Sequence, residues 1–593
     1  MKLPHACSRR VTGLGLTVLP MVLALATPAG AQALAVPHSQ APAATVTVGV
    51  SSATSTGVSN QFAGFSYEKQ MVGEDLFSTS NTRLVSLFKL LGPNVLRVGG
   101  NTVDETTWNP SGAGGSSSQI APGDVSKLAA FLTATGWKVI YGINLKTNSV
   151  SNAVSEATDA AKTLGSNLLA FEIGNEPMFY DSESQYESSY ASYEKAIAAA
   201  VPGAVFDGPG NPSTDWVPSF ASAESTANLK VLALHYYVGA ASGATVAAML
   251  ASTTASGSVP GQMATMQQAQ QSNHIPAWRV TEGNSFYNGG AAGVSNVEAA
   301  ALWALAFQQQ IAAHGGWGIN YHGGGTDAYS PITYSGLTPT GVQGVYYGQL
   351  LWHLAGTGPY HAATVSGGSD VYAWGIGDNV IIDNEGSAPI TAKVTLASPA
   401  TSAKSYTLTA SSLTSTSVTI AGSAVGADGS FSPKPSAVSV SGTSATVNVP
   451  AHSAGLLATN GGGKPSTIVG GGAGLCLSTT GGSAVNYTTA DVYTCNGSPS
   501  ESWVYQSASH TIMNANSGSC LSVTGGSAQP GSTADMYSCN GSSSESWTVR
   551  ADGTILNTNS KLCLSLTGGS TALKTTADVA SCDGSASEQW KLG

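Results

Sequence analysis

Residues 468–593 contain the same sequence pattern three times, and this repeat restricts the fold more than any other feature of the 593-residue chain. Each copy begins with CLS, continues through TGGS and ends in Glu-x-Trp, and the copies are spaced by 43 or 44 residues. A unit this short cannot bury its own apolar face, so the three copies must close around a shared core. We therefore predict a β-trefoil with pseudo-threefold symmetry and with Trp503, Trp547 and Trp590 packed inside it.

Six of the seven cysteines lie in this repeat, two in each copy. Within a copy the two cysteines are 19 residues apart, whereas the ligands of a structural metal site are usually separated by only a few residues. Disulfides are therefore the better interpretation, and they require an oxidising compartment. The predicted bridges are Cys476–Cys495, Cys520–Cys539 and Cys563–Cys582.

The first 31 residues have the pattern of a secretory signal peptide. A positively charged segment precedes an apolar run over residues 11–26, and the small residues at 29–31 fit a cleavage site. The Arg9-Arg10 pair leaves both the general secretory route and the twin-arginine route open. The apolar run is short for a membrane span, so we expect a secreted mature protein without a membrane anchor.

Charged residues are scarce, and 22 basic against 33 acidic side chains give a formal net charge of −11. The sequence has no basic run that could follow a nucleic acid backbone, which argues against a nucleic acid partner. No group of His, Asp and Glu has the spacing of metal ligands, and no Gly-rich phosphate loop follows the first predicted strand. We expect neither a metal nor a cofactor.

Between residues 61 and 355, short apolar segments alternate with longer segments of helical periodicity. In one of these, Leu84, Leu87 and Phe88 share a helical face before Gly92 ends the helix. Eight strands alternating with helices predict a (β/α)8 barrel, and a doubly wound sheet is the alternative. The predicted strands are residues 61–67, 94–98, 137–143, 167–173, 204–207, 230–236, 277–282 and 318–321.

After the barrel the sequence changes to alternating strands separated by Ser, Thr and Gly turns. Residues 356–460 include SYTLTASSL, SVTIAG and SATVNVPA, which are typical of an antiparallel β-sandwich. Residues 44–60 begin with ATVTVGVS and alternate in the same way, so we expect them to add a strand to this sandwich. The Gly-rich residues 461–467 predict a linker to the trefoil. The predicted fold class is multidomain, α/β in the barrel and all-β elsewhere.

Polar side chains follow several predicted barrel strands, at the end where barrel enzymes carry their active sites. Asn175 and Glu176 follow the fourth strand, and Glu282 ends the seventh. Two carboxylates on different strands suit glycoside hydrolysis, in which one protonates the leaving oxygen and the other attacks the anomeric carbon. Asn175 could bond a sugar 2-hydroxyl. A lone Glu at a strand end is commonly a solvated loop residue, so the prediction rests on the pair.

Five further residues at these strand ends are candidates for the same site. Glu68, Asn101 and Asp104 follow the first two strands and could bond sugar hydroxyls. His235 and Tyr236 end the sixth strand, where they could support the attacking carboxylate or serve a purely structural role.

These motifs resemble those of a known family. Asn175-Glu176 and Glu282 are similar to the catalytic residues of the clan A retaining glycosidases. FAGFSYE, LRVGGNTVD, IGNEP and VYYGQLLW more narrowly resemble glycoside hydrolase family 79, the β-glucuronidase and heparanase group, over residues 44–460. The resemblance implies that Glu176 is the general acid/base and Glu282 the nucleophile. It implies an exo-acting retaining β-glucuronidase that releases terminal glucuronic acid or its 4-O-methyl form from a glycan.

The resemblance also implies how the carboxylate of a glucuronide is held. In bacterial members of the family, tyrosine hydroxyls and backbone amides hold it, and Tyr287 and Tyr329 fit those positions better than Tyr334 does. Each of these tyrosines could instead only pack. The barrel is poor in Lys and Arg, which argues against heparanase-like cleavage of sulfated chains. The alternatives are another retaining β-glycosidase, such as a β-xylosidase or β-glucosidase, and a non-catalytic secreted carbohydrate-binding protein.

The triplicate resembles the ricin-type lectin domain, also called carbohydrate-binding module family 13. The Asp that such domains usually carry two residues after the first cysteine is replaced by Ser478, Ser522 and Ser565. The third repeat also has Ala580 where the other two have tyrosine. A trefoil that keeps the fold without binding sugar is therefore the alternative, and we expect a monomer. The candidate sugar-binding residues are Asp491, Tyr493 and Glu501 in the first repeat and Asp535, Tyr537 and Glu545 in the second.

Overall fold

The computed structural model describes residues 43–53, 57–224, 228–400, 402–459, 466–470, 472, 474–483, 485–506, 510–539, 542–550 and 552–592. The predicted signal peptide at 1–31 and residues 461–465 of the predicted linker lie outside these described residues. Within them, no helix has the length and apolar character needed to cross a membrane.

Eight parallel strands form a closed barrel, and each overlaps one of the predicted strands. They follow one another around the barrel in chain order, and the last pairs with the first to close it. The strands are β3 (Ala63–Glu68), β4 (Val95–Gly99), β7 (Lys138–Ile143), β8 (Leu168–Ile173), β9 (Phe206–Asn211), β10 (Leu229–Ala240), β11 (Ala277–Tyr287) and β12 (Ile319–Gly323). The prediction of a (β/α)8 barrel is confirmed.

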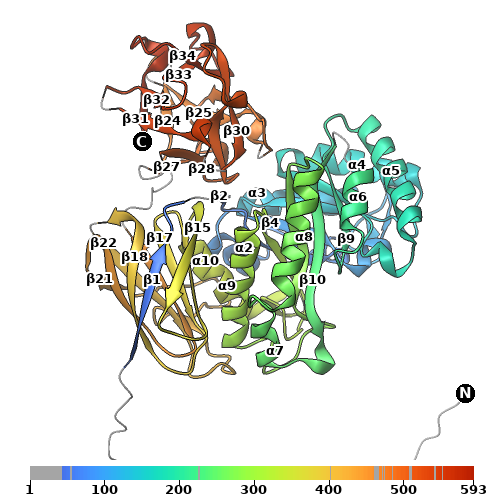
Figure 1. The fold of residues 1–593 in the computed structure, drawn as a ribbon. Coiled ribbons are helices and arrows are strands. Elements are labelled where there is room, and N and C mark those ends of the chain that lie inside the picture. Colours follow the sequence, from blue (N-terminus) through green and yellow to red (C-terminus); the bar gives the residue numbers. More distant parts are fainter. Residues whose placement is uncertain are drawn as a thin grey trace, which may run out of the picture. The chain divides into compact units, whose positions relative to one another are not determined.

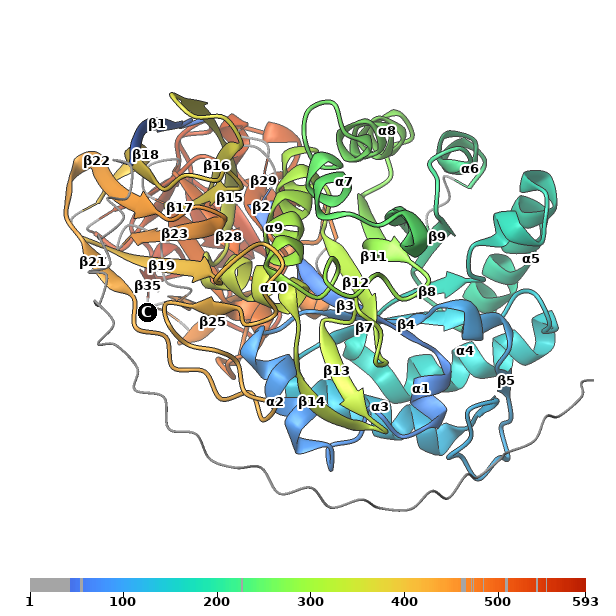
Figure 2. The ribbon, with the colours of Figure 1, turned by 90° about the horizontal axis from the view of Figure 1, so that it is seen from below.

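Helices surround these strands, as Figure 2 shows. They are α1 (Gln70–Gly73), α2 (Thr82–Leu90), α3 (Pro122–Thr135), α4 (Val150–Leu164), α5 (Glu183–Ala200), α6 (Val217–Ala223), α7 (Val246–Ala251), α8 (Ser258–Ser272), α9 (Glu298–Ala313) and α10 (Gly344–Leu354). Two short sheets lie in the loops that follow barrel strands, β5 (Thr107–Trp108) with β6 (Gln119–Ile120) and β13 (Ile332–Ser335) with β14 (Thr338–Val342). The barrel strands therefore carry their loops at one end, where a site can be assembled.

Among the residues that the structure describes, eleven further strands form one hydrogen-bonded sheet that folds around its own apolar core. They are β1 (Ala44–Val50), β2 (Gly57–Val58), β15 (Gly358–Ser366), β16 (Val371–Ile376), β17 (Asn379–Asn384), β18 (Ile390–Ala400), β19 (Ala403–Thr409), β20 (Thr419–Ile420), β21 (Ser436–Val438), β22 (Val440–Val449) and β23 (Ser453–Thr459). Figure 1 shows β1 among strands that are distant in sequence. It runs antiparallel to β15 but parallel to β18, so the expectation of a purely antiparallel sandwich is wrong at this pair.

Helix α9 packs between the barrel and this sheet, which explains why it is buried on almost every side. Its first two N–H groups, at Glu298 and Ala299, donate to the carbonyls of Ser415 and Leu413. The Glu298 side chain is fully buried, and neither carboxylate oxygen has a hydrogen-bond partner among the described residues. Burial raises the pKa of Glu298 to about 8. The carboxyl group is therefore protonated at neutral pH.

This buried carboxyl predicts that stability falls as the pH rises. The unfolded chain releases the Glu298 proton near the ordinary Glu pKa of about 4.3, whereas the folded chain holds it until about pH 8. The stability that the buried Glu298 carboxyl contributes is therefore fully present at acidic pH and is lost as the pH rises through that window.

We expect Glu298→Gln to raise the thermal midpoint at pH 8 and to have little effect at pH 4. Calorimetry at both pH values checks this. The exposed Glu105→Gln serves as the control, and an equal effect at both values would contradict the prediction.

The described part of the C-terminal region contains twelve short strands, which form the trefoil. They are β24 (Ile468–Gly470), β25 (Leu475–Thr479), β26 (Ala490–Tyr493), β27 (Trp503–Gln506), β28 (Thr511–Asn514), β29 (Ser519–Val523), β30 (Ser532–Ser538), β31 (Trp547–Val549), β32 (Ile555–Asn557), β33 (Cys563–Leu566), β34 (Ala577–Ala580) and β35 (Trp590–Leu592). Trp503, Trp547 and Trp590 share one apolar core, as predicted. Each indole N–H donates to the carbonyl of the leucine 26 residues earlier, at 2.7–2.8 Å.

The three predicted disulfides are present. Cys476–Cys495, Cys520–Cys539 and Cys563–Cys582 each close a loop with a sequence separation of 19 residues. Each bridge ties the first strand of its repeat to the loop after the second strand. A cross-link reduces the number of conformations that the unfolded chain can adopt. The bridges therefore stabilise repeats whose strands are only three to seven residues long.

Candidate active site

Glu176 lies directly after β8, at the start of a short 3-10 helix, η3 (Pro177–Phe179). Its backbone is left-handed, with φ 46° and ψ 52°. Its N–H donates to the carbonyl of Gly210 in β9, at 3.1 Å. A left-handed residue other than glycine costs about 1–2 kcal/mol, and such strained positions concentrate at functional sites. The strand end is thus held in a conformation that aims this carboxylate at the barrel mouth.

Glu282 lies within β11, and its carboxylate accepts hydrogen bonds on both oxygens. Arg97 Nη1 donates to Oε2 at 2.5 Å, and the Tyr237 hydroxyl donates to Oε1 at 2.7 Å. His322 Nδ1 lies 3.5 Å from Oε2. Burial opposes ionisation of this carboxyl group, but the electrostatic interactions with His322, His235 and Arg97 and the Tyr237 hydrogen bond outweigh it. The pKa of Glu282 is therefore lowered, and the group is ionised over the whole physiological range.

Glu176 and Glu282 face each other across the barrel mouth. One oxygen of each carboxylate and one ring nitrogen of His235 all lie within 4.8 Å of one another. His235 Nδ1 lies 3.0 Å from Glu176 Oε1, and its Nε2 lies 3.3 Å from Arg97 Nη2. His235 therefore connects the two carboxylates, because it contacts one and the cation that holds the other.

Arg97 in β4 organises the floor of the site. It is fully buried and donates to Glu282, to Asn175 Oδ1 at 2.9 Å and to Ser66 Oγ at 3.2 Å. Its Nε also donates to Glu172 Oε1, at 2.8 Å. Burial works against the charge, but the carboxylates of Glu172 and Glu282 outweigh it and raise the pKa of Arg97. A single guanidinium thus fixes the position of the amide and of one carboxylate of the candidate pair.

A second buried carboxyl lies beside this ion pair. Asp207 in β9 is the strand partner of Glu172 in β8, and both are buried in the barrel interior. Neither oxygen of Asp207 has a hydrogen-bond partner among the described residues. Burial and then the neighbouring charge of Glu172 raise the pKa of Asp207 well above its usual range. The barrel interior therefore carries Asp207 as a neutral acid and Glu172 as the counterion of Arg97.

Strand β10 supplies a residue that the sequence analysis missed. Side chains two apart on a strand share a face, so His235 and Tyr237 both point into the barrel. Tyr236 points the other way, and its hydroxyl lies 2.8 Å from Ser258 Oγ in α8 while its ring packs against Phe307. The assignment of Tyr236 to the site is wrong, and Tyr237 takes that place. The alternation rule applied to His235-Tyr236-Tyr237 would have found it.

The polar residues after the first two strands have different surroundings. Glu68 accepts from the N–H and hydroxyl of Thr102, both at 2.7 Å, and lies 3.7 Å from His322 Nε2 at the edge of the site. Asn101 is exposed, and its N–H donates to Glu68. Asp104 is buried and accepts from the N–H groups of Leu145, Lys146 and Asn175 and from the Tyr180 hydroxyl. Asp104 therefore positions the Asn175 loop, and its predicted contact with a sugar is wrong.

Two of the three candidate tyrosines lie at the rim of the site. Tyr287 ends β11 and is 45% exposed, and its ring centroid lies 6.3 Å from that of Tyr237. Tyr329 is mostly buried and also lies 6.3 Å from Tyr237. Tyr334 is buried elsewhere, and its hydroxyl lies 2.7 Å from that of Tyr67. The rings of the first two therefore lie beside Tyr237, whose hydroxyl donates to Glu282, whereas Tyr334 is paired with Tyr67 outside the site.

Glu176, His235 and Glu282 are also the group of described residues whose spacing could hold a metal ion. The guanidinium of Arg97 donates to Glu282 and contacts His235, so a cation placed between these ligands would meet a fixed positive charge. The donor set thus fits a cation poorly and fits a pair of acid–base groups well.

Replacing Arg97 tests this organisation. Arg97→Met would leave Glu172 and Glu282 buried without their shared counterion, which costs about 3–5 kcal/mol. The pKa of Glu282 would rise towards or above its usual range, so the acidic limb of any activity profile would move to higher pH. Chemical unfolding and a pH–rate profile measure the two effects. Arg83→Met, on an exposed turn of α2, is the control and should change stability by less than about 0.5 kcal/mol. Wild-type stability in Arg97→Met would contradict the role assigned to the guanidinium.

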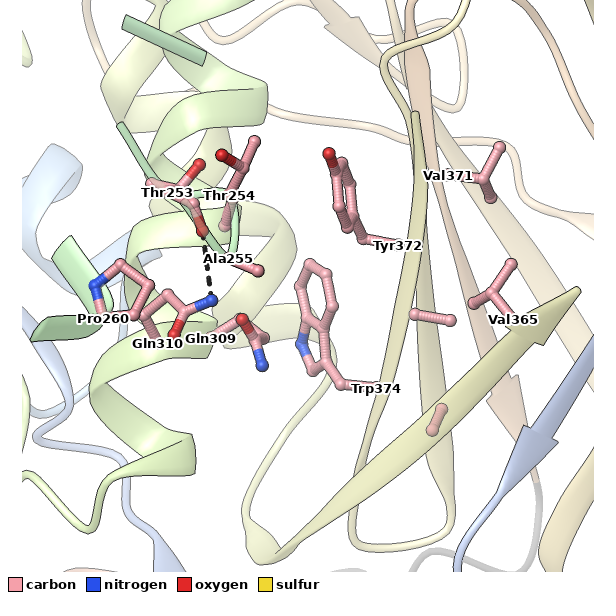
Figure 3. A pocket seen from close by; sticks show the side chains of 13 residues that line it. Thr253, Thr254, Ala255, Pro260, Gln309, Gln310, Val365, Val371, Tyr372 and Trp374 are labelled. Atoms are coloured by element: carbon pink, nitrogen blue, oxygen red, sulfur yellow. Dashed lines mark hydrogen bonds between the residues drawn. The ribbon is translucent and has the colours of Figure 1, made fainter. Parts of the chain in front are cut away.

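A separate cavity of about 480 Å³ lies between the barrel helices and the β-sheet. Figure 3 shows Tyr372 and Trp374 of β16 on one side and Gln309 and Gln310 of α9 on the other. The Gln310 side chain donates to the carbonyl of Thr253 at 3.1 Å, which ties α9 to the neighbouring loop. None of the candidate catalytic residues lines this cavity, so it is distinct from the site around Glu176 and Glu282.

The four candidate carboxylates of the trefoil, Asp491, Glu501, Asp535 and Glu545, are all buried, whereas Tyr493 is exposed. Glu501 is 1% exposed, and its Oε2 accepts from the N–H groups of Asn496 and Gly497 at 3.1 Å. Glu545 is fully buried. The assignment of these two glutamates to sugar contacts is therefore wrong, because they stabilise the repeat from inside. The remaining candidates are Asp491 and Tyr493 in the first repeat and Asp535 and Tyr537 in the second.

Comparison with known proteins is consistent with both parts of this description. The family model of the ricin-type beta-trefoil lectin domain matches residues 464–590. The chain is 27% identical over 340 residues to a beta-glucuronidase of Aspergillus niger, in an alignment that covers 49% of this chain and 61% of that protein. The chain therefore spans less than two thirds of the length of this relative.

Solved structures share the fold of about 70% of the chain. A crystal structure of a 4-O-α-L-rhamnosyl-β-D-glucuronidase from Fusarium oxysporum, in complex with Rha-GlcA, matches with a TM-score of 0.57 at 21% identity, over 70% of this chain and 100% of that one. A family 51 α-L-arabinofuranosidase from Bifidobacterium longum matches over the same shares with a TM-score of 0.56 at 16% identity. At these identities the likeness shows a common fold. A lectin-type trefoil thus follows a barrel whose architecture is also that of glycosidases.

Proposed function

We propose that this protein is a secreted, retaining exo-β-glucuronidase of glycoside hydrolase family 79 that releases terminal glucuronic acid or its 4-O-methyl form. The pairing of Glu176 with an ionised Glu282, with oxygens within 4.8 Å, carries the proposal. Retaining enzymes hold their two carboxyl groups about 5–5.5 Å apart, and inverting enzymes about 6.5–9.5 Å. The similarity to the Aspergillus niger enzyme supports a glucuronide as the substrate.

Each carboxylate has one task in the first step. Glu282 attacks the anomeric carbon, while Glu176 gives its proton to the departing glycosidic oxygen. The sugar is then linked covalently to Glu282, and Glu176 is ionised. In the second step Glu176 takes a proton from water, whose oxygen attacks the same carbon and releases Glu282. Two inversions give a product with the original β configuration.

The surrounding residues support this chemistry. Arg97 and Tyr237 hold Glu282 in the ionised form and fix its position. His235 contacts Glu176 and can orient it. Asn175, held by Arg97, is proposed to bond the sugar 2-hydroxyl. Tyr287 is exposed at the rim, and its ring lies beside that of Tyr237. It is proposed, with Tyr329, to receive the carboxylate of the glucuronide.

A panel of aryl glycosides tests the reaction and the sugar together. We expect turnover of an aryl β-glucuronide at least about 100-fold above that of the β-glucoside, β-xyloside, β-galacturonide and α-L-arabinofuranoside, because an unpaired polar pocket rejects a sugar without the matching group. Proton NMR of the first product should show the β anomer. If a neutral glycoside were turned over fastest, the proposed specificity for glucuronides would be wrong. If the first product were the α anomer, the retaining mechanism would be excluded.

We also propose that the trefoil binds carbohydrate and keeps the enzyme near its polymeric substrate. The match of residues 464–590 to the lectin domain supports this. The three disulfides support export to an oxidising compartment. Binding by the first two repeats rests on Asp491 with Tyr493 and on Asp535 with Tyr537.

A further inference from the structure

The cavity between α9 and the β-sheet lies where two strands separate. Strands β15 and β16 are paired from Tyr360 with Ile376 to Ala362 with Trp374. Beyond this last pair, β15 pairs with β1 but no longer with β16. The unpaired ends of both strands line the cavity, and α9 lies opposite them. The separation of the strands thus leaves a recess of about 480 Å³, which is within the usual size of a small-molecule site.

Two aromatic side chains of β16 form one wall of this cavity. Tyr372 and Trp374 are two residues apart, so they lie on the same face of the strand, and Figure 3 shows both rings beside the cavity. Trp374 is buried and packs against Trp352, with ring centroids 6.2 Å apart at 35°. Tyr372 is only half-buried. The wall therefore has a fixed inner ring and an accessible outer ring on which the apolar face of a ligand can stack.

The opposite wall offers hydrogen-bond acceptors. Gln309 Nε2 donates to the Tyr360 hydroxyl at 2.6 Å, and Gln310 Nε2 donates to the carbonyl of Thr253 at 3.1 Å. The Thr254 hydroxyl donates to a carbonyl of α7 at 2.9 Å. Each of these side chains uses a donor within the protein, while its oxygen can still accept. The wall is therefore complementary to a ligand that carries several O–H groups.

The surroundings of the cavity favour an uncharged ligand. None of the thirteen described residues that line it is charged. Burial and then interactions with Glu385, Asp370 and Asp383 raise the pKa of Tyr372 to about 12. These neighbouring groups are all acidic, so they offer no counterion to an anion. An anionic sugar would be enclosed without a compensating charge, which is unfavourable.

We propose that this cavity is a second carbohydrate site, which binds a neutral pyranose. The apolar face of the sugar ring stacks on Tyr372. Its hydroxyls donate to the side-chain oxygens of Gln309, Gln310 and Thr254. The site is separate from the trefoil and from the candidate catalytic pair. It takes neutral residues of a glycan, not the glucuronic acid that the barrel is proposed to remove, and it does not depend on that catalysis.

Fluorine NMR gives a signal that is specific to this site. The full chain is produced with fluorotryptophan, and Trp374→Phe identifies the Trp374 resonance among those of the 11 tryptophans. The labelled protein is titrated with methyl β-D-xylopyranoside, methyl β-D-galactopyranoside and methyl β-D-glucopyranoside. We expect at least one of them to shift the Trp374 resonance in a saturable manner. Absence of a shift with all three glycosides would overturn the proposal.

Methyl β-D-glucuronide tests the preference for a neutral sugar, because it differs from the glucoside only in carrying a carboxylate. We expect it to bind at the Trp374 signal at least about tenfold more weakly than the glucoside does. The active site proposed in the barrel has the opposite preference, so the two sites are distinguished by the same pair of ligands. Equal or tighter binding of the glucuronide at Trp374 would also overturn the proposal.

Substitutions on both walls test the assigned contacts. Tyr372→Ala removes the stacking ring and should lower the affinity measured at Trp374 about tenfold, whereas Tyr372→Phe keeps the ring and should bind like the wild type. Thr254→Val removes an acceptor from the opposite wall and should lower the affinity about fivefold. Tyr493→Ala, in the trefoil, is the control for sugar bound elsewhere and should leave the Trp374 titration unchanged.

Wild-type affinity in both Tyr372→Ala and Thr254→Val would refute the assignment of this cavity. Turnover of an aryl β-glucuronide by these two variants should equal that of the wild type, because the cavity is separate from Glu176 and Glu282. Failure of the glucuronidase proposal would therefore appear in a different assay from failure of this one.

Discussion

Glu282→Gln is expected to lower kcat for an aryl β-glucuronide by about 10⁴-fold or more, which corresponds to roughly 5 kcal/mol of lost transition-state stabilisation. The amide matches the carboxylate in size but cannot form the glycosyl bond. It can still accept one hydrogen bond, from Tyr237 or from Arg97, so the pocket should keep its shape. Steady-state turnover and substrate affinity measured together check this, because the loss should appear in kcat and not in binding.

Restoring activity with an added nucleophile distinguishes a carboxylate that attacks the sugar from one that only supports the site. In Glu282→Ala, azide can enter the space of the missing side chain and attack the anomeric carbon directly, which gives an α-glucuronyl azide after a single inversion. Glu105→Gln, at an exposed position, serves as the control for preparation and assay. Wild-type turnover by Glu282→Gln would rule out the proposed mechanism.

Glu176→Ala should produce a loss that depends on the leaving group. A general acid contributes about 10²–10⁴-fold, and a substrate with a basic leaving oxygen needs all of it. A dinitrophenyl glucuronide needs almost no protonation, so its first step should be nearly as fast as in the wild type. The glycosyl-enzyme would then accumulate, because no base activates water in the second step.

A series of aryl glucuronides with leaving groups of increasing pKa measures this dependence. The slope of log kcat/KM against that pKa should be steep in Glu176→Ala and shallow in the wild type. Azide should restore turnover with a β-glucuronyl azide as the product, the opposite anomer to that from Glu282→Ala. An equal loss for all leaving groups would show that Glu176 has another role.

The architecture of the barrel could be predicted from sequence because each strand has its own local signal. Apolar segments, helical periodicity and the glycines between them repeat eight times, so an error at one boundary does not disturb the others. The positions of Glu176 and Glu282 followed from the rule that strand ends converge at one rim. The structure adds that their oxygens lie within 4.8 Å, a distance that depends on the tilt and register of strands and cannot be read from spacing.

The groups that hold the two carboxylates were harder to predict. Arg97 lies in the middle of a buried strand. A charged residue in such a position indicates that an oppositely charged partner is near, but the sequence does not identify that partner. Its partners Glu172 and Glu282 are 75 and 185 residues away. Tyr237, by contrast, follows from the alternation of side chains along a strand, because it lies two residues after His235 in β10. Asp104 looked like a sugar ligand because its backbone partners are invisible in a sequence.

In the trefoil the repeat predicted the core and the bridges, since equivalent residues have the same structural role in each copy. It failed for Glu501 and Glu545, because a residue found in all three repeats is as consistent with an internal structural role as with a ligand contact.

The left-handed backbone at Glu176 has a consequence for the whole molecule. Selection for thermal robustness alone would favour glycine or asparagine at this position, since both adopt this conformation more readily than glutamate. Either would remove the carboxylate. The folded protein therefore retains a local conformational penalty of about 1–2 kcal/mol, and a more heat-resistant descendant would have to gain its stability at positions other than this one.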